Sequence, residues 1–285
     1  MNIIQEQIFR EQWRQGYIAP QSSSYARVMA ICALSANRML SGATVSTRDI
    51  TEILEPKHYL EQAIASIQTN SDKPPDFEKL QAISIVCVAA METSDVVLLQ
   101  RFLGLYHGTL AQQGFHDEKR WPEGISAAET EGRRRLYWHM YRLEVHTSLV
   151  FGHPVRCPEL QSAVAYPDLT DDDFTESNHE MEWLSGWNFV TDIYRGIEHL
   201  ISYYKARRAG LNPKARSLST AFLVDYDPRN KILMPLELVF QNLPGRFKLA
   251  LPMSQDVRQN RCGFQTANIV ATYQVRYDDC GQVSC

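Results

Sequence analysis

Two groups of side chains in this sequence are of the types that bind metal ions: an aspartate run, Asp171–Asp173, and the histidines His139 and His146. Carboxylates bind Ca²⁺ and Mg²⁺, but the aspartate run lacks the alternating spacing and the glycine of a calcium loop. It also precedes a predicted helix start, where carboxylates are favoured by the helix dipole alone. The histidines stand at i and i+7, beyond the i, i+4 spacing of helical zinc sites. A structural role is the simpler interpretation of both groups, and an enzyme site remains an alternative.

An arginine triplet, Arg133–Arg135, is a second candidate, because guanidinium groups bind phosphates and carboxylates. Successive residues of a helix are rotated by about 100°, so these side chains spread over about 200° and cannot all face one phosphate line. Two polar faces flank the apolar stripe of this segment: Arg135, His139, Arg142 and His146 on one side, and Tyr137, Tyr141, Glu144 and Ser148 on the other. We therefore expect structural ion pairs, with ligand or partner contact and catalysis as the alternatives.

Known catalytic signatures do not match elsewhere in the sequence. The glycines are isolated, there is no G-x-S-x-G motif, and the six cysteines include no CxxC pair. We therefore assign no catalytic, cofactor-binding or metal-binding residue, and we expect the chain to be no enzyme.

Apolar residues recur at helical spacing almost from end to end, and they predict an all-α, multi-helix fold. The first stripe is Val28, Ile31, Cys32, Ser35 and Met39. Further helices are predicted to begin at Pro56, near Leu80 and Leu99, after the capping box Ser126–Glu129, after the capping box Ser177–Glu180, and over 231–242 and 263–274. Gly114 and Gly152 are expected to end two of them. No alternation is sustained enough to predict a sheet.

The long helix after Ser177 carries a heptad-like seam. Its residues are Trp183, Trp187, Val190, Tyr194, Ile197, Ile201 and Tyr204. Packing inside a helical bundle is the simpler interpretation, and dimerisation is the alternative.

Composition and charge limit the classes of partner. Acidic residues outnumber basic ones, 33 to 29, for a net charge of -4, which argues against a chain that binds DNA by itself. The first residues lack the apolar core of a secretory signal, and no long apolar window predicts a membrane span, so we expect an intracellular protein. Residues 205–216 hold five bases and no acid; a solvated loop is the simpler interpretation, and a nuclear-localisation or acidic-partner segment is the alternative.

Residues 131–154 resemble one family closely: the fungal-specific transcription-factor domain, or middle homology region, of binuclear zinc-cluster regulators. Members carry a glutamate, two or three arginines and an aromatic pair, followed by a helix with a Ser-Leu pair that ends in Gly and Pro. The matching residues here include Glu131, Arg133, Arg134, Arg135, Trp138, Tyr141, Ser148, Gly152 and Pro154. His153 stands where the family usually has Arg, and Glu144 where it often has Asp.

The resemblance extends over roughly residues 8–275 and implies a regulatory domain over 1–275, incomplete at both ends, followed by an irregular tail over 276–285. It further implies a nuclear regulator of RNA polymerase II transcription that acts by interaction, with other regulatory proteins as partners in a homo- or heterodimer. Zinc and DNA binding would belong to a cysteine-rich domain that this sequence lacks, so no cofactor is expected in this chain. The alternatives are a standalone co-regulator that dimerises with an intact factor, and an enzyme on the same helical scaffold.

Overall fold

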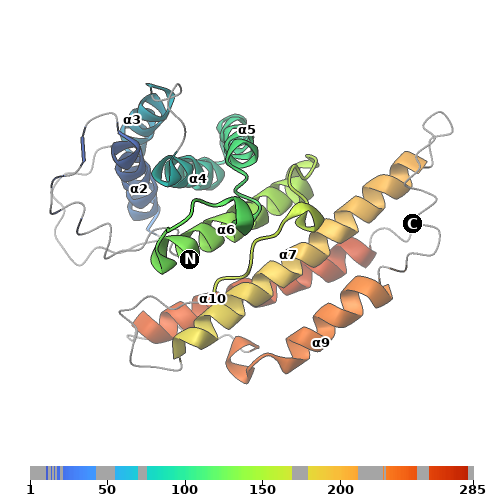
Figure 1. The fold of residues 1–285 in the computed structure, drawn as a ribbon. Coiled ribbons are helices and arrows are strands. Elements are labelled where there is room, and N and C mark those ends of the chain that lie inside the picture. The colour runs from blue at the N-terminus through green and yellow to red at the C-terminus, as the bar shows by residue number, and fades with distance from the viewer. Residues whose placement is uncertain are drawn as a thin grey trace. The chain divides into compact units, whose positions relative to one another are not determined.

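The protein is all-α, as predicted (Figure 1). A computed structural model describes residues 22–42, 55–69, 76–168, 179–210, 229–248 and 257–281, together with Asp227 and a few positions before residue 22. The helices are α2 (Ser23–Leu40), α3 (Pro56–Thr69), α4 (Phe77–Glu92), α5 (Val96–Gln113), α6 (Ala127–Phe151), α7 (His179–Gly210), α9 (Met234–Asn242) and α10 (Val257–Gly281). Short turns are η1 (Glu118–Arg120), η2 (Glu159–Gln161), η4 (Arg229–Leu233) and η5 (Gly245–Phe247). The described residues contain no strand, only one parallel bridge between Asp117 and Ala163.

The chain divides into two compact units. Unit 1 comprises Met1–Met140 with Ser162–Ala165, and unit 2 comprises Tyr141–Gln161 with Tyr166–Cys285. Helix α6 supplies its first part to unit 1 and its second part to unit 2. The single domain expected over residues 1–275 stays a prediction.

In unit 1, α2 and α4 run parallel with a constant offset. Polar pairs 54 positions apart join them along their length: Ser24 with Glu78, Arg27 with Gln81, and Arg38 with Glu92. The apolar side chains that α2 buries are small: Ala26, Val28, Ala30, Ala33 and Ala36. Small side chains let the helix axes approach, so α2 packs against both α3 and α4.

The first predicted stripe is therefore wrong in detail. Val28 is buried, but Ile31 and Cys32 are only partly buried, and Ser35 is exposed. Close helix contact favours small side chains, so α2 buries its alanines in place of the larger residues of the predicted stripe. The predicted ends of two other helices are confirmed: Gly114 and Gly152 follow α5 and α6 with φ of 62° and 74°, in the left-handed region that favours glycine.

In unit 2, α7 packs against α10, α9 and η4, and Figure 1 shows α7 and α10 side by side. Near the end of α7, Leu200 joins Ile232 and Leu236 in a small core against which Tyr204 and Leu233 pack. The prediction of an irregular tail from residue 276 is wrong for residues 276–281, because α10 continues to Gly281. No proline or glycine lies between Gly263 and Gly281, so nothing in that stretch stops the helix. Residues 282–285 lie outside the described residues.

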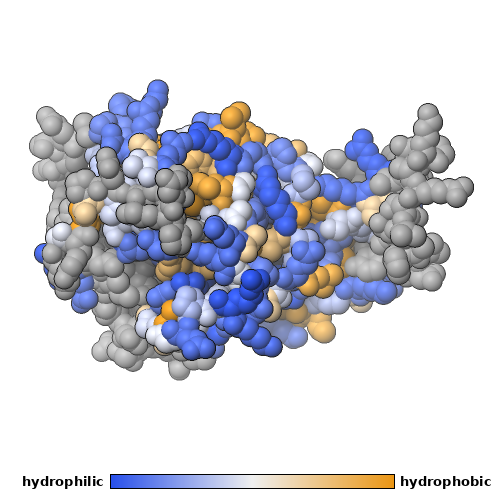
Figure 2. Space-filling model, turned by 45° about the horizontal axis from the view of Figure 1, so that its top comes forward, coloured by the Kyte–Doolittle hydropathy of each residue, from blue (hydrophilic) through white to orange (hydrophobic). Residues whose placement is uncertain are grey.

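On the face that Figure 2 shows, the coloured residues are mostly hydrophilic, with apolar side chains among them. The exposed large apolar residues include Val97 on α5, Leu160 in η2, Met234 and Leu238 on α9, and Phe264 on α10. Within the part of the chain that the structure describes, no helix has the length and apolar character needed to cross a bilayer.

Two glycines inside α7 mark places where neighbouring segments come close. A Cβ at Gly186 would stand 2.7 Å from the Gln265 side chain, and one at Gly196 would stand 2.5 Å from Leu236 Cδ1. The seam prediction overlooked both positions, although an interior glycine in a helix is itself a signal of close packing.

Replacing Gly196 by alanine is expected to destabilise unit 2 by about 1–3 kcal/mol, because the new methyl group overpacks the contact with Leu236 and Ile232. The same change at Gly104 in α5 is a matched control, since a Cβ there meets nothing within 4 Å. Gly104→Ala should stabilise the protein by about 1 kcal/mol through helix propensity. Urea unfolding of both variants measures this, and equal effects at the two sites would contradict the assignment.

Candidate functional site

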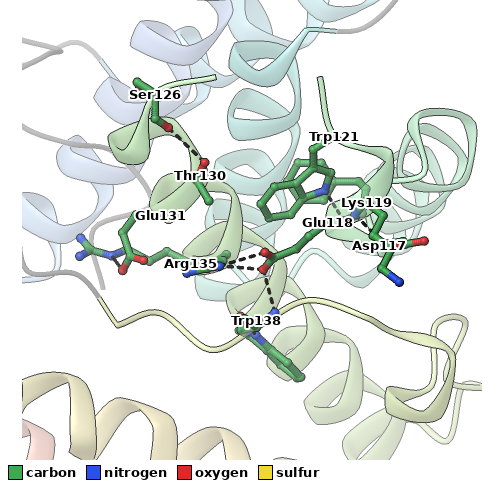
Figure 3. Close-up of polar contacts among 12 residues, drawn as sticks. Asp117, Glu118, Lys119, Trp121, Ser126, Thr130, Glu131, Arg135 and Trp138 are labelled. Atoms are coloured by element: carbon green, nitrogen blue, oxygen red, sulfur yellow. Dashed lines mark hydrogen bonds and ion pairs between the residues drawn. The ribbon is translucent and has the colours of Figure 1, made fainter. Parts of the chain in front are cut away.

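The three arginines of α6 each have a carboxylate partner within unit 1. Ion pairs join Arg133 to Glu129 at 2.7 Å, Arg134 to Glu118 at 2.8 Å and Arg135 to Glu131 at 3.0 Å. Figure 3 shows Glu131 and Arg135 on α6 and the carboxylate of Glu118 facing that helix. The structural ion pairs expected for this segment are present at the three arginines, and the three guanidinium groups point to separate partners as the helical rotation requires.

Arg133 lies among aromatic rings as well as beside its carboxylate. Its guanidinium carbon is 5.0 Å from the centroid of the Phe77 ring, 5.5 Å from that of Phe115 and 5.8 Å from that of Trp121. Trp121 is fixed in turn, because its indole N–H donates to the carbonyl of Phe115 at 3.0 Å. Cation–π attraction of this kind strengthens when the cation is desolvated, and Arg133 is buried. Arg133 therefore links α6 to α4 and to the segment after α5.

Glu118 in η1 is a site residue that the sequence did not indicate. It connects the N-terminal part of α6 to residues 162–165. Its carboxylate accepts hydrogen bonds from Arg134 Nε and Nη2 and from the backbone N–H of Ala165. The hydrogen bond from Arg134 is the largest of the effects that lower the pKa of Glu118. Trp138 of the family motif holds the same segment, since its indole N–H donates to the Ala165 carbonyl at 2.9 Å. Glu118 and Trp138 thus fasten residues 162–165 to α6.

In unit 2, the second half of the motif holds the chain as it turns after α6. The buried carboxylate of Glu144 accepts from the backbone N–H of Arg156 at 3.0 Å and from its guanidinium at 2.9 Å. Ser148 Oγ donates to the carbonyl of His153 at 2.5 Å, and Lys205 Nζ donates to the same carbonyl at 2.6 Å. Gly152 and Pro154 lie within the turn that these bonds define.

Tyr141, the remaining motif residue, enters a buried hydrogen-bond network with α7. Its hydroxyl donates to Glu198 Oε2 at 2.7 Å, and the backbone N–H of Glu159 donates to the same oxygen at 2.9 Å. The Glu159 side chain accepts from Arg195 and lies 3.3 Å from His199 Nε2. Burial alone would raise the pKa of Glu159, but the hydrogen bonds from His199 and Arg195 lower it to about 2. The hydrogen bond to Glu159 raises the pKa of His199.

Arg142 is buried against an aromatic ring of α7. Its guanidinium carbon is 3.6 Å from the centroid of the Trp187 ring, and burial lowers the pKa of Arg142 to about 9. His146, on the same polar face of α6, lies beside Tyr194, with 3.4 Å between His146 Nδ1 and the Tyr194 hydroxyl. Burial also lowers the pKa of His146. Arg142 and His146, both in the part of α6 that belongs to unit 2, therefore pack on α7.

Most residues of the predicted seam of α7 pack against other residues of unit 2. Val190 and Ile197 are buried, Trp187 and Tyr194 face α6, and Tyr204 packs against the Leu200 core. Ile201 is partly buried, and the side chain of Trp183 lies outside the described residues. The packing matches the simpler interpretation of the seam, while dimerisation itself stays a prediction.

The structure does not arrange the candidate metal-binding groups as a metal site in the residues that it describes. Asp171–Asp173 lie outside the described residues, and His139 is partly buried in α6. Over the described ranges, no three His, Cys, Asp or Glu side chains gather closely enough to hold a metal ion.

Comparison with known proteins shows which family the chain belongs to. The model of the fungal specific transcription factor domain matches residues 4–205, and the chain belongs to this family. Membership places it among transcription regulators.

A 135-residue stretch is 30% identical to pyrimidine pathway regulatory protein 1 of Saccharomyces cerevisiae. That stretch is 47% of this chain and 14% of the yeast protein, so the chain matches only a small part of that relative. No solved structure matches.

Proposed function

We propose that this chain is the regulatory domain of a nuclear regulator of RNA polymerase II transcription, and that it acts by protein interaction without catalysis. The observation that carries the proposal is the family match over residues 4–205. Two structural features support a non-catalytic role. The motif arginines Arg133–Arg135 are engaged in internal ion pairs, and Tyr141, Glu144 and Ser148 accept or donate internal hydrogen bonds.

DNA contact in this proposal belongs to a zinc-cluster domain or to a partner protein, and the chain itself carries no cofactor. The net charge of -4 supports this division, because phosphate contacts require an excess of basic groups. Regulation would consist of a ligand or partner that favours one helical packing over another. Homo- or heterodimerisation remains part of the proposal. Because most seam residues of α7 pack inside unit 2, the dimer contact would use another surface.

A tethering experiment tests the proposal. The chain is fused to a heterologous DNA-binding domain that carries its own nuclear-import signal, and reporter mRNA is measured against the DNA-binding domain alone. We expect reporter mRNA to rise or fall, and an unchanged level would contradict the regulatory role. In a gel shift at physiological salt, the isolated chain should cause no sequence-dependent retardation of DNA. Tight, sequence-dependent binding would contradict the proposal that DNA contact belongs to another domain or a partner protein.

A further inference from the structure

The short turn η2 in unit 2 is attached to α7 by polar contacts. All of its residues, Glu159–Gln161, are at least partly exposed, and the central leucine is 81% exposed. Glu159 makes the attachment: its backbone N–H donates to Glu198 Oε2 at 2.9 Å, and its carboxylate accepts from Arg195 and lies 3.3 Å from His199 Nε2. A surface element that buries little apolar area opens easily, so its order depends on such contacts.

The titratable groups around His199 come from three parts of unit 2. They are Tyr141 on α6, Glu159 and Tyr166 on the segment between α6 and α7, and Asp192, Arg195 and Glu198 on α7. The three carboxylates of this network face one permanent cation, Arg195, and a second cation only while His199 is protonated. Loss of that proton leaves three carboxylates with a single positive charge.

Histidine is the side chain whose charge ordinarily changes near neutral pH. Burial would raise the pKa of Glu159, but the hydrogen bonds from His199 and Arg195 lower it to about 2, so Glu159 is ionised at neutral pH. Burial raises the pKa of Tyr141 and Tyr166, so both hydroxyls keep their protons. The His199 side chain is 31% exposed, so its proton can exchange with solvent.

We propose that η2 is a pH-dependent latch on α7, closed while His199 is protonated and loosened when His199 releases its proton to solvent. In the closed state, the imidazolium donates from Nε2 to the Glu159 carboxylate, and a hydrogen bond between two charged groups is stronger than one to a neutral donor. After deprotonation, Glu159 keeps Arg195 but faces Glu198 with one cation fewer. This inference goes beyond the proposed function, because it makes the proton a ligand that favours one arrangement of unit 2.

The direction of the pH dependence follows from the contact between His199 and Glu159. The hydrogen bond to Glu159 raises the pKa of His199 above its ordinary value of 6.5, although partial burial opposes the shift. A group whose pKa is raised by folding stabilises the folded state below its unfolded pKa. The stabilisation is therefore fully present below pH 6.5 and is lost as the pH rises through the raised pKa of His199.

Solvent exchange of backbone amides, measured by NMR on the full chain, tests the latch. The Glu159 N–H reports directly on it, because this donor is bonded to Glu198 in the closed state. Between about pH 6 and about pH 8.5, its protection, corrected for the intrinsic pH dependence of exchange, should fall by about threefold as expected for a partly exposed charged pair. Amides of the buried α7 residues Val190 and Ile193 should keep their protection.

Variants assign the effect to His199. His199→Gln keeps a donor that cannot become charged, so it should show the loosened protection of Glu159 at every pH. His58→Gln is the matched control, because His58 is exposed on α3 in unit 1, and it should keep the wild-type profile. Glu159→Gln removes the carboxylate and should lower the pKa of His199, followed through its imidazole Cε1–H resonance.

Three results would overturn the latch. The first is wild-type protection of the Glu159 amide that is constant with pH, and the second is a wild-type pH dependence that persists in His199→Gln. The third is a parallel loss of protection at Val190 and Ile193, which would mean that unit 2 opens as a whole. If His199→Gln does not fold, the imidazole titration decides, since an unchanged pKa of His199 in Glu159→Gln contradicts the inference.

Discussion

Replacing Glu198 by alanine is expected to lower the free energy of unfolding by about 2–6 kcal/mol. Its carboxylate accepts from two donors, the Tyr141 hydroxyl and the Glu159 backbone N–H, and both Glu198 and Tyr141 are buried. Leaving the buried Tyr141 hydroxyl without an acceptor costs about 1–3 kcal/mol, and the partly buried Glu159 N–H adds at most a similar amount. Urea unfolding followed by circular dichroism measures the loss, and hydrogen exchange of the α7 amides locates it in unit 2.

Two controls isolate the role of this network. Glu198→Gln keeps an acceptor oxygen and should lose less than half as much stability as Glu198→Ala. Glu61→Ala removes a carboxylate from an exposed pair with Lys57, where the two charged atoms are 3.9 Å apart, and should change stability by less than about 0.5 kcal/mol. If Glu198→Ala is as mild as Glu61→Ala, the buried network does not stabilise unit 2.

The fold class and most helix positions could be predicted because they depend on local signals. Pro56 begins α3, the Ser126 hydroxyl accepts from the Glu129 N–H at 3.1 Å, and Gly114 adopts the left-handed conformation after α5. Each signal acts within one turn of helix, so a single sequence contains it. The error at α2 arose because its buried alanines matter only once α3 and α4 lie against them.

The partners of the motif residues could not be predicted, because they come from distant parts of the chain. The ion pair of Glu131 and Arg135 is the local exception, since residues at i and i+4 share one helix face. Glu118 for Arg134, Glu198 for Tyr141 and Trp187 for Arg142 depend on how loops and helices return to α6. Nothing in the local pattern of those three residues identifies them as partners.

Removing one member of the Glu131–Arg135 pair should be the most damaging single change in unit 1. Both side chains are buried, and Glu131→Ala takes the carboxylate away from a buried guanidinium, which costs about 3–5 kcal/mol. Glu129→Ala is the matched comparison on the same helix, because the Glu129 side chain is 35% exposed. Its partner Arg133 keeps the aromatic rings around it, so the loss there should be about 1 kcal/mol.

The double variant Glu131→Ala/Arg135→Met distinguishes two possibilities. Either the ion pair stabilises unit 1 more than apolar residues would, or the loss in Glu131→Ala comes only from leaving Arg135 without its carboxylate. Well-packed apolar replacements of buried ion pairs are often neutral or stabilising, so the double variant should recover most of the stability lost in Glu131→Ala. Chemical unfolding of the two single variants and the double variant gives the coupling energy. A double variant as unstable as the sum of its single variants would mean that the two residues act independently. Recovery of stability would instead show that these motif residues maintain the fold of α6, and the tethered reporter would then measure whether they have any role beyond it.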